Sequence, residues 1–125
     1  MRLGAIDNAI VHVIDSSCVL DLQQLRDVTL DDPDLMREIL TALMEDTSAQ
    51  VTKLASAIEA LDSKNCEQLA HYCKGACSNV GANAAAEVFR QIELDAKAVQ
   101  FQKCAAAMTV LGTEMERLRL AISEV

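Results

Sequence analysis

Apolar residues recur at alternating intervals of three and four along most of the chain, which is the period of an amphipathic α-helix. The longest run follows Asp31-Asp32-Pro33-Asp34, a sequence that starts a helix because Asp32 can cap it and Pro33 suits its first position. The spacing predicts one helix from there to Leu61, about five heptads long. Its apolar stripe consists of Met36, Leu40, Leu43, Val51, Leu54, Ile58 and Leu61, with Thr47 as the one polar member.

The same period predicts three more helices, over residues 64–80, 83–99 and 104–122. Gly81 suits the turn between the first two, and Asn83 can cap the second. The inward positions are Cys66, Leu69, Ala70, Cys73, Ala76, Cys77 and Val80, then Ala85, Val88, Phe89, Ile92 and Ala96, then Met108, Leu111, Met115, Leu118 and Ile122. Because the connections are short, the four long helices are expected to pack as an antiparallel, up-down-up-down four-helix bundle.

The N-terminal part carries shorter patterns. Residues 10–14 are β-branched enough for a strand, but residues 3, 6, 10 and 13 also repeat at helical spacing, which favours an accessory helix. Val19, Leu22, Leu25 and Val28 predict a short helix after Ser16 and Ser17. We therefore expect an all-α fold with one or two short accessory N-terminal helices, divided into an N-terminal extension (1–17) and a bundle domain (18–125).

Composition supports this fold and excludes several functions. One proline and four glycines are too few for the turns of a sandwich or barrel. The net charge of −8, with 11 dispersed basic residues, argues against a nucleic-acid partner. The sequence shows neither an apolar run of about 18 residues nor a signal-peptide pattern at its start, so we expect a soluble, cytoplasmic protein without membrane insertion.

The five cysteines are then expected to be free thiols in a reducing compartment. Cys66, Cys73, Cys77 and Cys104 invite an alternative interpretation as a metal or redox site. Cys66, Cys73 and Cys77 lie on one inward stripe, however, which favours a role in packing. His12 has no partner motif, and we expect it to be structural or solvated.

The candidate chemistry lies in residues 68–78. His71, Lys74, Gly75 and Ser78 fall on one helical face, with Gln68 in the same column. An imidazole, a cation and a hydroxyl side by side suit the handling of phosphate. Glycine inside a helix costs about 1 kcal/mol relative to alanine, and a bare backbone at Gly75 would let another macromolecule approach the ring.

His71-x-x-Lys74-Gly75, preceded by Ala70 and followed by Gly81-Ala82 and Ile92-Glu93, resembles the signature of histidine-containing phosphotransfer (Hpt) domains. The resemblance covers residues 18–122. It implies a bundle in which His71 takes a phosphoryl group from the aspartate of one receiver domain and passes it to another. The implied partners are response-regulator receiver domains and a hybrid sensor histidine kinase, and the implied state is a monomer.

The resemblance also implies roles for single residues. Glu93 lies about as far beyond the predicted turn as His71 lies before it, so it would orient the ring, and Lys74 would neutralise phosphoryl oxygens. Ser78 and Gln68 would flank the site, and Arg90 is a candidate second cation. Exposed apolar residues of the first helices would dock the partner, with Leu25, Val28 and Leu35 as candidates.

We expect a carrier without kinase activity, because the sequence has no phosphate loop or nucleotide motif. No cofactor or metal is expected in this chain, since in the family the magnesium belongs to the receiver. The alternatives are a helical adaptor that docks receivers without phosphotransfer and, more distantly, a metal-binding bundle.

Overall fold

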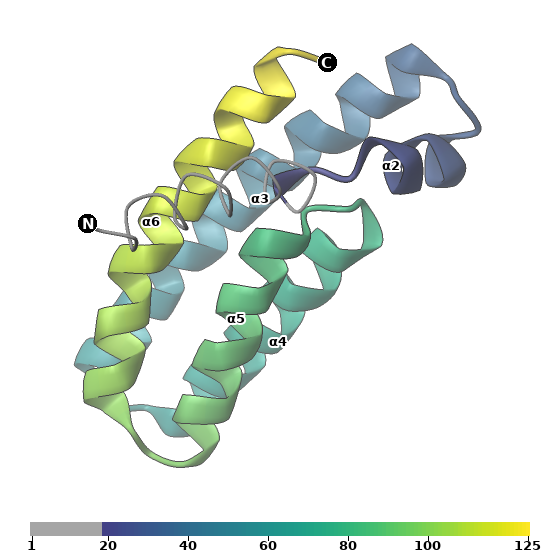
Figure 1. Ribbon diagram of the computed structural model, residues 1–125. Helices are drawn as coiled ribbons and strands as arrows, with labels where there is room; N and C mark the ends of the chain where they lie inside the picture. The colour runs from purple at the N-terminus through teal and green to yellow at the C-terminus, as the bar shows by residue number, and fades with distance from the viewer. Residues whose placement is uncertain (1–18) are drawn as a thin grey trace, which may run out of the picture.

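The computed structural model describes residues 19–125, which form five α-helices and contain no strand. The helices are α2 (Leu22–Thr29), α3 (Pro33–Glu59), α4 (Ser63–Asn79), α5 (Asn83–Lys97) and α6 (Phe101–Ser123) (Figure 1). The predicted extension, its accessory helix and His12 lie outside the described residues. None of the described helices is both long and apolar enough to cross a membrane.

The four long helices pack as a closed antiparallel bundle. Each of α3, α4 and α5 contacts the helix that follows it, and α6 returns to contact α3. The short helix α2 lies at one end of the bundle, beside the turn that joins α4 to α5 (Figure 1). The all-α bundle with an accessory N-terminal helix is therefore confirmed.

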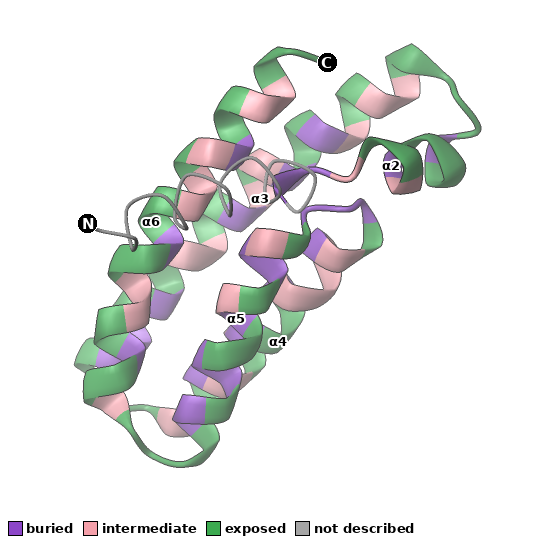
Figure 2. Cartoon of the chain, viewed as in Figure 1, coloured by how far each residue is buried: buried purple, intermediate pink, exposed green. Residues whose placement is uncertain are grey.

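Buried positions alternate with exposed ones along the helices, at the predicted period (Figure 2). The core is mostly aliphatic, with Phe89 as its one fully buried aromatic among the described residues. Four free cysteines are fully buried in it: Cys66, Cys73, Cys77 and Cys104. Burial raises the pKa of Cys66 to about 11 and the pKa of Cys73 to about 12, so both thiols stay protonated near pH 7.

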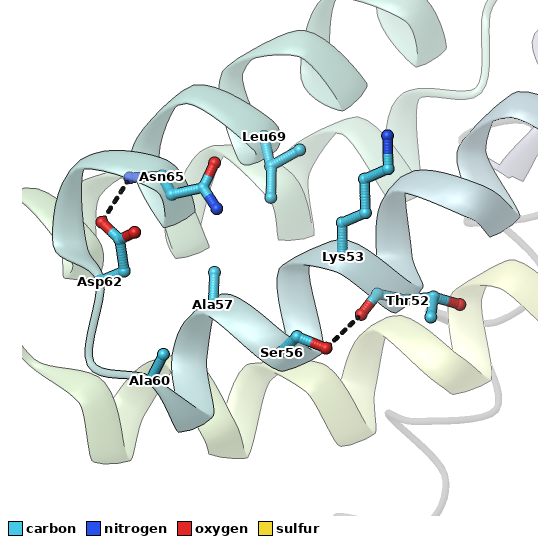
Figure 3. Close-up of a pocket in the computed structure, with 8 residues that line it drawn as sticks. All are labelled: Thr52, Lys53, Ser56, Ala57, Ala60, Asp62, Asn65 and Leu69. Carbon is cyan, nitrogen blue, oxygen red and sulfur yellow. Dashed lines mark hydrogen bonds between the residues drawn. The ribbon is translucent and has the colours of Figure 1, made fainter.

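Aspartate side chains cap the N-terminal ends of α3 and α4. Asp32 accepts hydrogen bonds from the N–H groups of Asp34 and Leu35, as its capping role requires. At the next connection, the Asp62 carboxylate accepts from the N–H of Asn65, beside a shallow groove between α3 and α4 (Figure 3). Both caps follow directly from short polar side chains placed before an amphipathic run.

Two predicted helix boundaries are wrong. The long helix α3 has 27 residues and stops before Leu61, which is 65% exposed and adopts a left-handed conformation with φ of 56°. Asn83 does not cap α5; the cap position is Ala82, and the Asn83 amide instead donates to Gln24 of α2 at 3.4 Å. The Asn83 side chain, which the sequence pattern assigned to the cap of α5, therefore makes a tertiary contact with α2 instead.

Gly81 joins α4 to α5 and also holds α2 in place. It has a φ of 90°, a conformation that L side chains rarely adopt. Its carbonyl accepts a hydrogen bond from the N–H of Asp21 at 2.9 Å, and the Gln24 amide donates to the carbonyl of Ser78 in the last turn of α4. The start of α2 therefore rests directly on the α4–α5 turn.

Replacing Gly81 with alanine is expected to lower the free energy of unfolding by about 2 kcal/mol, because a Cβ there would lie 2.8 Å from the Asp21 carbonyl oxygen and an L side chain is strained at this φ. Urea denaturation measures the loss. The matched control is Gly112→Ala in α6, where an added Cβ meets nothing within 4 Å, and a gain of up to about 1 kcal/mol is expected. Equal stability of Gly81→Ala and the unsubstituted protein would contradict this account of the turn.

Candidate functional site

The α4–α5 hairpin brings His71 and Glu93 together on its surface. The His71 ring nitrogen Nδ1 lies 3.0 Å from Glu93 Oε2. The His71 side chain is 66% exposed, whereas the Glu93 side chain is only 9% exposed. An ionised carboxylate can only accept, so Nδ1 carries the proton and the lone pair of the imidazole resides on Nε2.

Two lysines surround the Glu93 carboxylate. Lys74 Nζ lies 3.0 Å from Oε1, and Lys97 Nζ lies 3.7 Å from Oε2, the oxygen that also contacts His71. Oε1 is buried and receives no well-directed hydrogen bond, so the ammonium charge of Lys74 is its main compensation. Glu93 thus lies within reach of one imidazole and two cations.

These contacts keep Glu93 ionised. Burial pushes the pKa of this carboxyl upwards, but the nearby Lys74 ammonium and the His71 ring together outweigh burial, so the pKa lies below its ordinary value. Because the folded-state pKa is depressed, the carboxylate stabilises the fold above the ordinary carboxyl range, and this contribution is lost as the pH falls through the folded pKa. The acceptor for Nδ1–H is therefore present at neutral pH.

Lys97 was not among the residues predicted from sequence. The sequence feature that could have indicated Lys97 is its i+4 spacing from Glu93 on α5, which places the two side chains on one helical face. Arg90, the predicted second cation, is not brought to the cluster, because it forms an ion pair with Glu87 one turn earlier on the same helix. The second cation beside Glu93 is Lys97 instead.

The other predicted site residues on α4 are Gly75, Gln68 and Ser78, and each has different surroundings. An added Cβ on Gly75 would meet nothing within 4 Å, so the surface is open there. Gln68 lines an open hollow of about 460 Å³ together with Glu67, His71, Tyr72 and Glu93. The Ser78 hydroxyl donates to the carbonyl of Lys74 at 2.8 Å, so it is engaged within its own helix.

The predicted docking residues on the first helices are partly wrong. Leu25 is fully buried and cannot contact a partner, because it faces the bundle from the inner side of α2. Val28 is 49% exposed, and Leu35 is half-buried. Of the three candidates, Val28 on the outer side of α2 is the most exposed.

No group of three or more histidine, cysteine or acidic side chains among residues 19–125 is arranged to hold a metal ion. Cys66, Cys73, Cys77 and Cys104 are free and fully buried, whereas His71 is exposed, so they do not share its surface. The chemistry available on the described surface of the hairpin is that of an imidazole beside a carboxylate and two ammonium groups.

Comparisons with known proteins identify the fold and the family of the chain. A search of curated proteins gives no match. Among solved structures, the chain is similar to histidine-containing phosphotransfer protein B (HptB) from Pseudomonas aeruginosa PAO1, with a TM-score of 0.79 and 24% sequence identity over 85% of this chain and 92% of that chain. The sequence profile of the family described as Hpt domain matches residues 38–121, from α3 to the last turns of α6. The chain therefore belongs to the family of histidine-containing phosphotransfer (Hpt) domains, which carry phosphoryl groups in phosphorelays.

Proposed function

We propose that His71 Nε2 accepts a phosphoryl group from the aspartyl phosphate of one receiver domain and passes it to the aspartate of another. The observation that carries the proposal is the contact between Nδ1 of an exposed imidazole and a buried carboxylate. This contact fixes the tautomer and leaves the nucleophilic nitrogen available to a partner. The chain acts as a carrier and draws no phosphate from ATP.

The transfer step needs no metal from this chain. The lone pair on Nε2 forms a bond to phosphorus while the bond from phosphorus to the aspartyl oxygen breaks, and its electrons leave with the aspartate. The ring becomes positively charged and keeps its proton on Nδ1, where Glu93 stabilises that charge. Transfer to the second receiver reverses these steps, with magnesium supplied by the receivers.

The two lysines have different roles in this proposal. Lys74 compensates the buried Oε1 of Glu93 and so holds the carboxylate in place for His71. Lys97 is 52% exposed and lies 0.7 Å farther from its carboxylate oxygen than Lys74 does (3.7 against 3.0 Å). Because Lys97 is the more exposed and the more distant of the two ammonium groups, it is the one placed to turn towards the phosphoryl oxygens while Lys74 keeps its contact with Oε1.

Incubation with a phosphorylated receiver domain tests the proposal. We expect phosphate on this chain that is stable in base and labile in acid, as a phosphoramidate is, and that maps to His71 by mass spectrometry of peptides kept at alkaline pH. Phosphate on another residue would overturn the assignment. A complex with the receiver that never takes up phosphate would favour an adaptor that docks without transfer.

Replacing Glu93 with alanine is expected to slow phosphate uptake about tenfold, because the ring loses the acceptor that fixes its tautomer and stabilises its charge. Glu93→Gln keeps an acceptor and should lose less. Initial rates with a phosphorylated receiver measure both effects. Glu87→Ala is the control, since Glu87 is an exposed carboxylate on the same helix that pairs with Arg90; an equal loss in this control would contradict the role of Glu93.

A further inference from the structure

Tyr72, the neighbour of His71 on α4, is exposed, but its side chain is held by a hydrogen bond. Its side chain is 51% exposed, and its hydroxyl donates a hydrogen bond to Asp46 Oδ2 on α3. The hydrogen bond to Asp46 raises the pKa of the phenol, so the hydroxyl stays protonated and keeps donating at neutral pH. One end of the ring is thus fixed to the neighbouring helix while much of its surface faces solvent.

The two sides of His71 are not equivalent. On the side towards α5, the ring meets Glu93, and Lys74 fills the adjacent space. On the other side, an α-helix advances by about 100° per residue, so Gly75 lies about 40° around the axis from His71 and about 60° from Tyr72. Gly75 therefore lies between the imidazole and the phenol, with open space above it.

We propose that the Tyr72 ring is the aromatic anchor for the receiver domain that exchanges phosphate with His71, which approaches across Gly75 from the side of α3. The inference rests on the proposed function, because the occupant is the partner that must bring its aspartate to Nε2. The receiver would present an apolar side chain next to its acidic pocket, to pack on the ring.

Three features make Tyr72 suited to this role. It borders the open hollow of about 460 Å³ that also contains His71, so a partner seated there contacts both. Its hydroxyl is already bonded, so docking orders little that is mobile, which limits the entropic cost of binding. Tyrosine is also among the residues that most often carry the binding energy of an interface, because it offers a large rigid surface with only two rotatable bonds.

The chain contains one tyrosine and no tryptophan, which permits a direct test. Incorporation of 3-fluorotyrosine labels Tyr72 alone, and its ¹⁹F resonance is expected to shift or broaden when a receiver domain is added. Tyr72→Ala is expected to raise the KM for the phosphorylated receiver about 30-fold, with little change in kcat. Tyr72→Phe keeps the ring but loses the bond to Asp46, and should give a smaller rise.

Phosphoramidate, a small phosphoryl donor, separates docking from chemistry. Tyr72→Ala should label on His71 with phosphoramidate as fast as the unsubstituted protein, since no docking is involved. Val110→Ala on α6 is the control, because Val110 is 52% exposed and lies outside the hairpin that carries His71; its KM should not change.

Two results would overturn the anchor while leaving the proposed function intact. One is a ¹⁹F resonance that does not respond to a receiver that does phosphorylate His71. The other is a KM for Tyr72→Ala no higher than that of Val110→Ala. Failure of the proposed function itself would appear differently, as an absence of receiver-driven phosphate on His71 in the unsubstituted protein.

Discussion

The His71→Gln variant is expected to take up no measurable phosphate from a phosphorylated receiver, a loss of more than about a thousandfold in rate. An amide nitrogen has no lone pair available for attack on phosphorus, so removal of Nε2 removes the reaction and leaves nothing to replace it. Gel or mass-spectrometric detection of labelled protein over a time course measures the loss. Equal labelling of the variant and the unsubstituted protein would exclude His71 as the phosphoryl acceptor.

The same variant should otherwise behave normally. The His71 side chain is 66% exposed, and the amide of a glutamine can still donate towards Glu93, so folding and receiver affinity should be nearly unchanged. Circular dichroism during urea titration and binding by calorimetry check both. A variant that binds the receiver but takes no phosphate assigns the loss to chemistry, whereas a variant that fails to bind would assign it to docking.

Gly75→Gln is expected to reduce the rate of transfer between this chain and a receiver about 100-fold, because a side chain at this point displaces the partner from the geometry needed for reaction. The fold itself has room, since an added Cβ meets nothing within 4 Å. Helicity should therefore be retained. A transfer rate in the Gly75→Gln variant close to that of the unsubstituted protein would contradict the explanation of this glycine as an approach point.

Two further measurements isolate the cause. Gly75→Ala should raise the free energy of unfolding by up to about 1 kcal/mol, because alanine is the better helix former and no neighbour is displaced. Labelling of Gly75→Gln by phosphoramidate should remain close to normal, because a small donor needs less room than a protein domain. The combination of a more stable helix and slower protein-driven transfer would assign Gly75 to function rather than to folding.

The hydrophobic period was sufficient to predict the bundle, because each long helix buries a continuous stripe and the connections are too short for any other order. The pairing of His71 with the region of Glu93 follows from similar separations on either side of the turn at Gly81 and Ala82. Such local, periodic constraints are readable in sequence because they depend on main-chain geometry more than on side-chain choice.

Side-chain partners were harder to predict, because several groups compete for each charge. Arg90 and Lys97 both lie about one helical turn from Glu93. Lys97 contacts Glu93, whereas Arg90 forms its ion pair with Glu87. Tyr72 and Asp46 are separated by 26 residues, and no motif marks their contact. These choices depend on the reach and competition of long side chains, which residue spacing alone does not specify.

The ends of two helices were also hard to predict from sequence. The connections that follow them place large apolar residues in a left-handed conformation, where glycine is usual. Leu61 and Val99 have φ values of 56° and 57° after α3 and α5. Without a glycine to mark the end, the apolar pattern continues past the last helical residue, and Leu61 was assigned to the stripe of α3. The cost of this conformation is about 1–2 kcal/mol for each residue.

The short separation of His71 and Glu93 along the chain has a consequence for how such a domain can vary in sequence. His71 and Glu93 are only 22 residues apart and belong to one hairpin, so closing the loop between them costs little entropy. The pair therefore depends on one short segment of the chain, whereas α3 and α6 contribute chiefly packing around it. Substitutions on those two helices can therefore change the stability of the domain while the contact between His71 and Glu93 is kept.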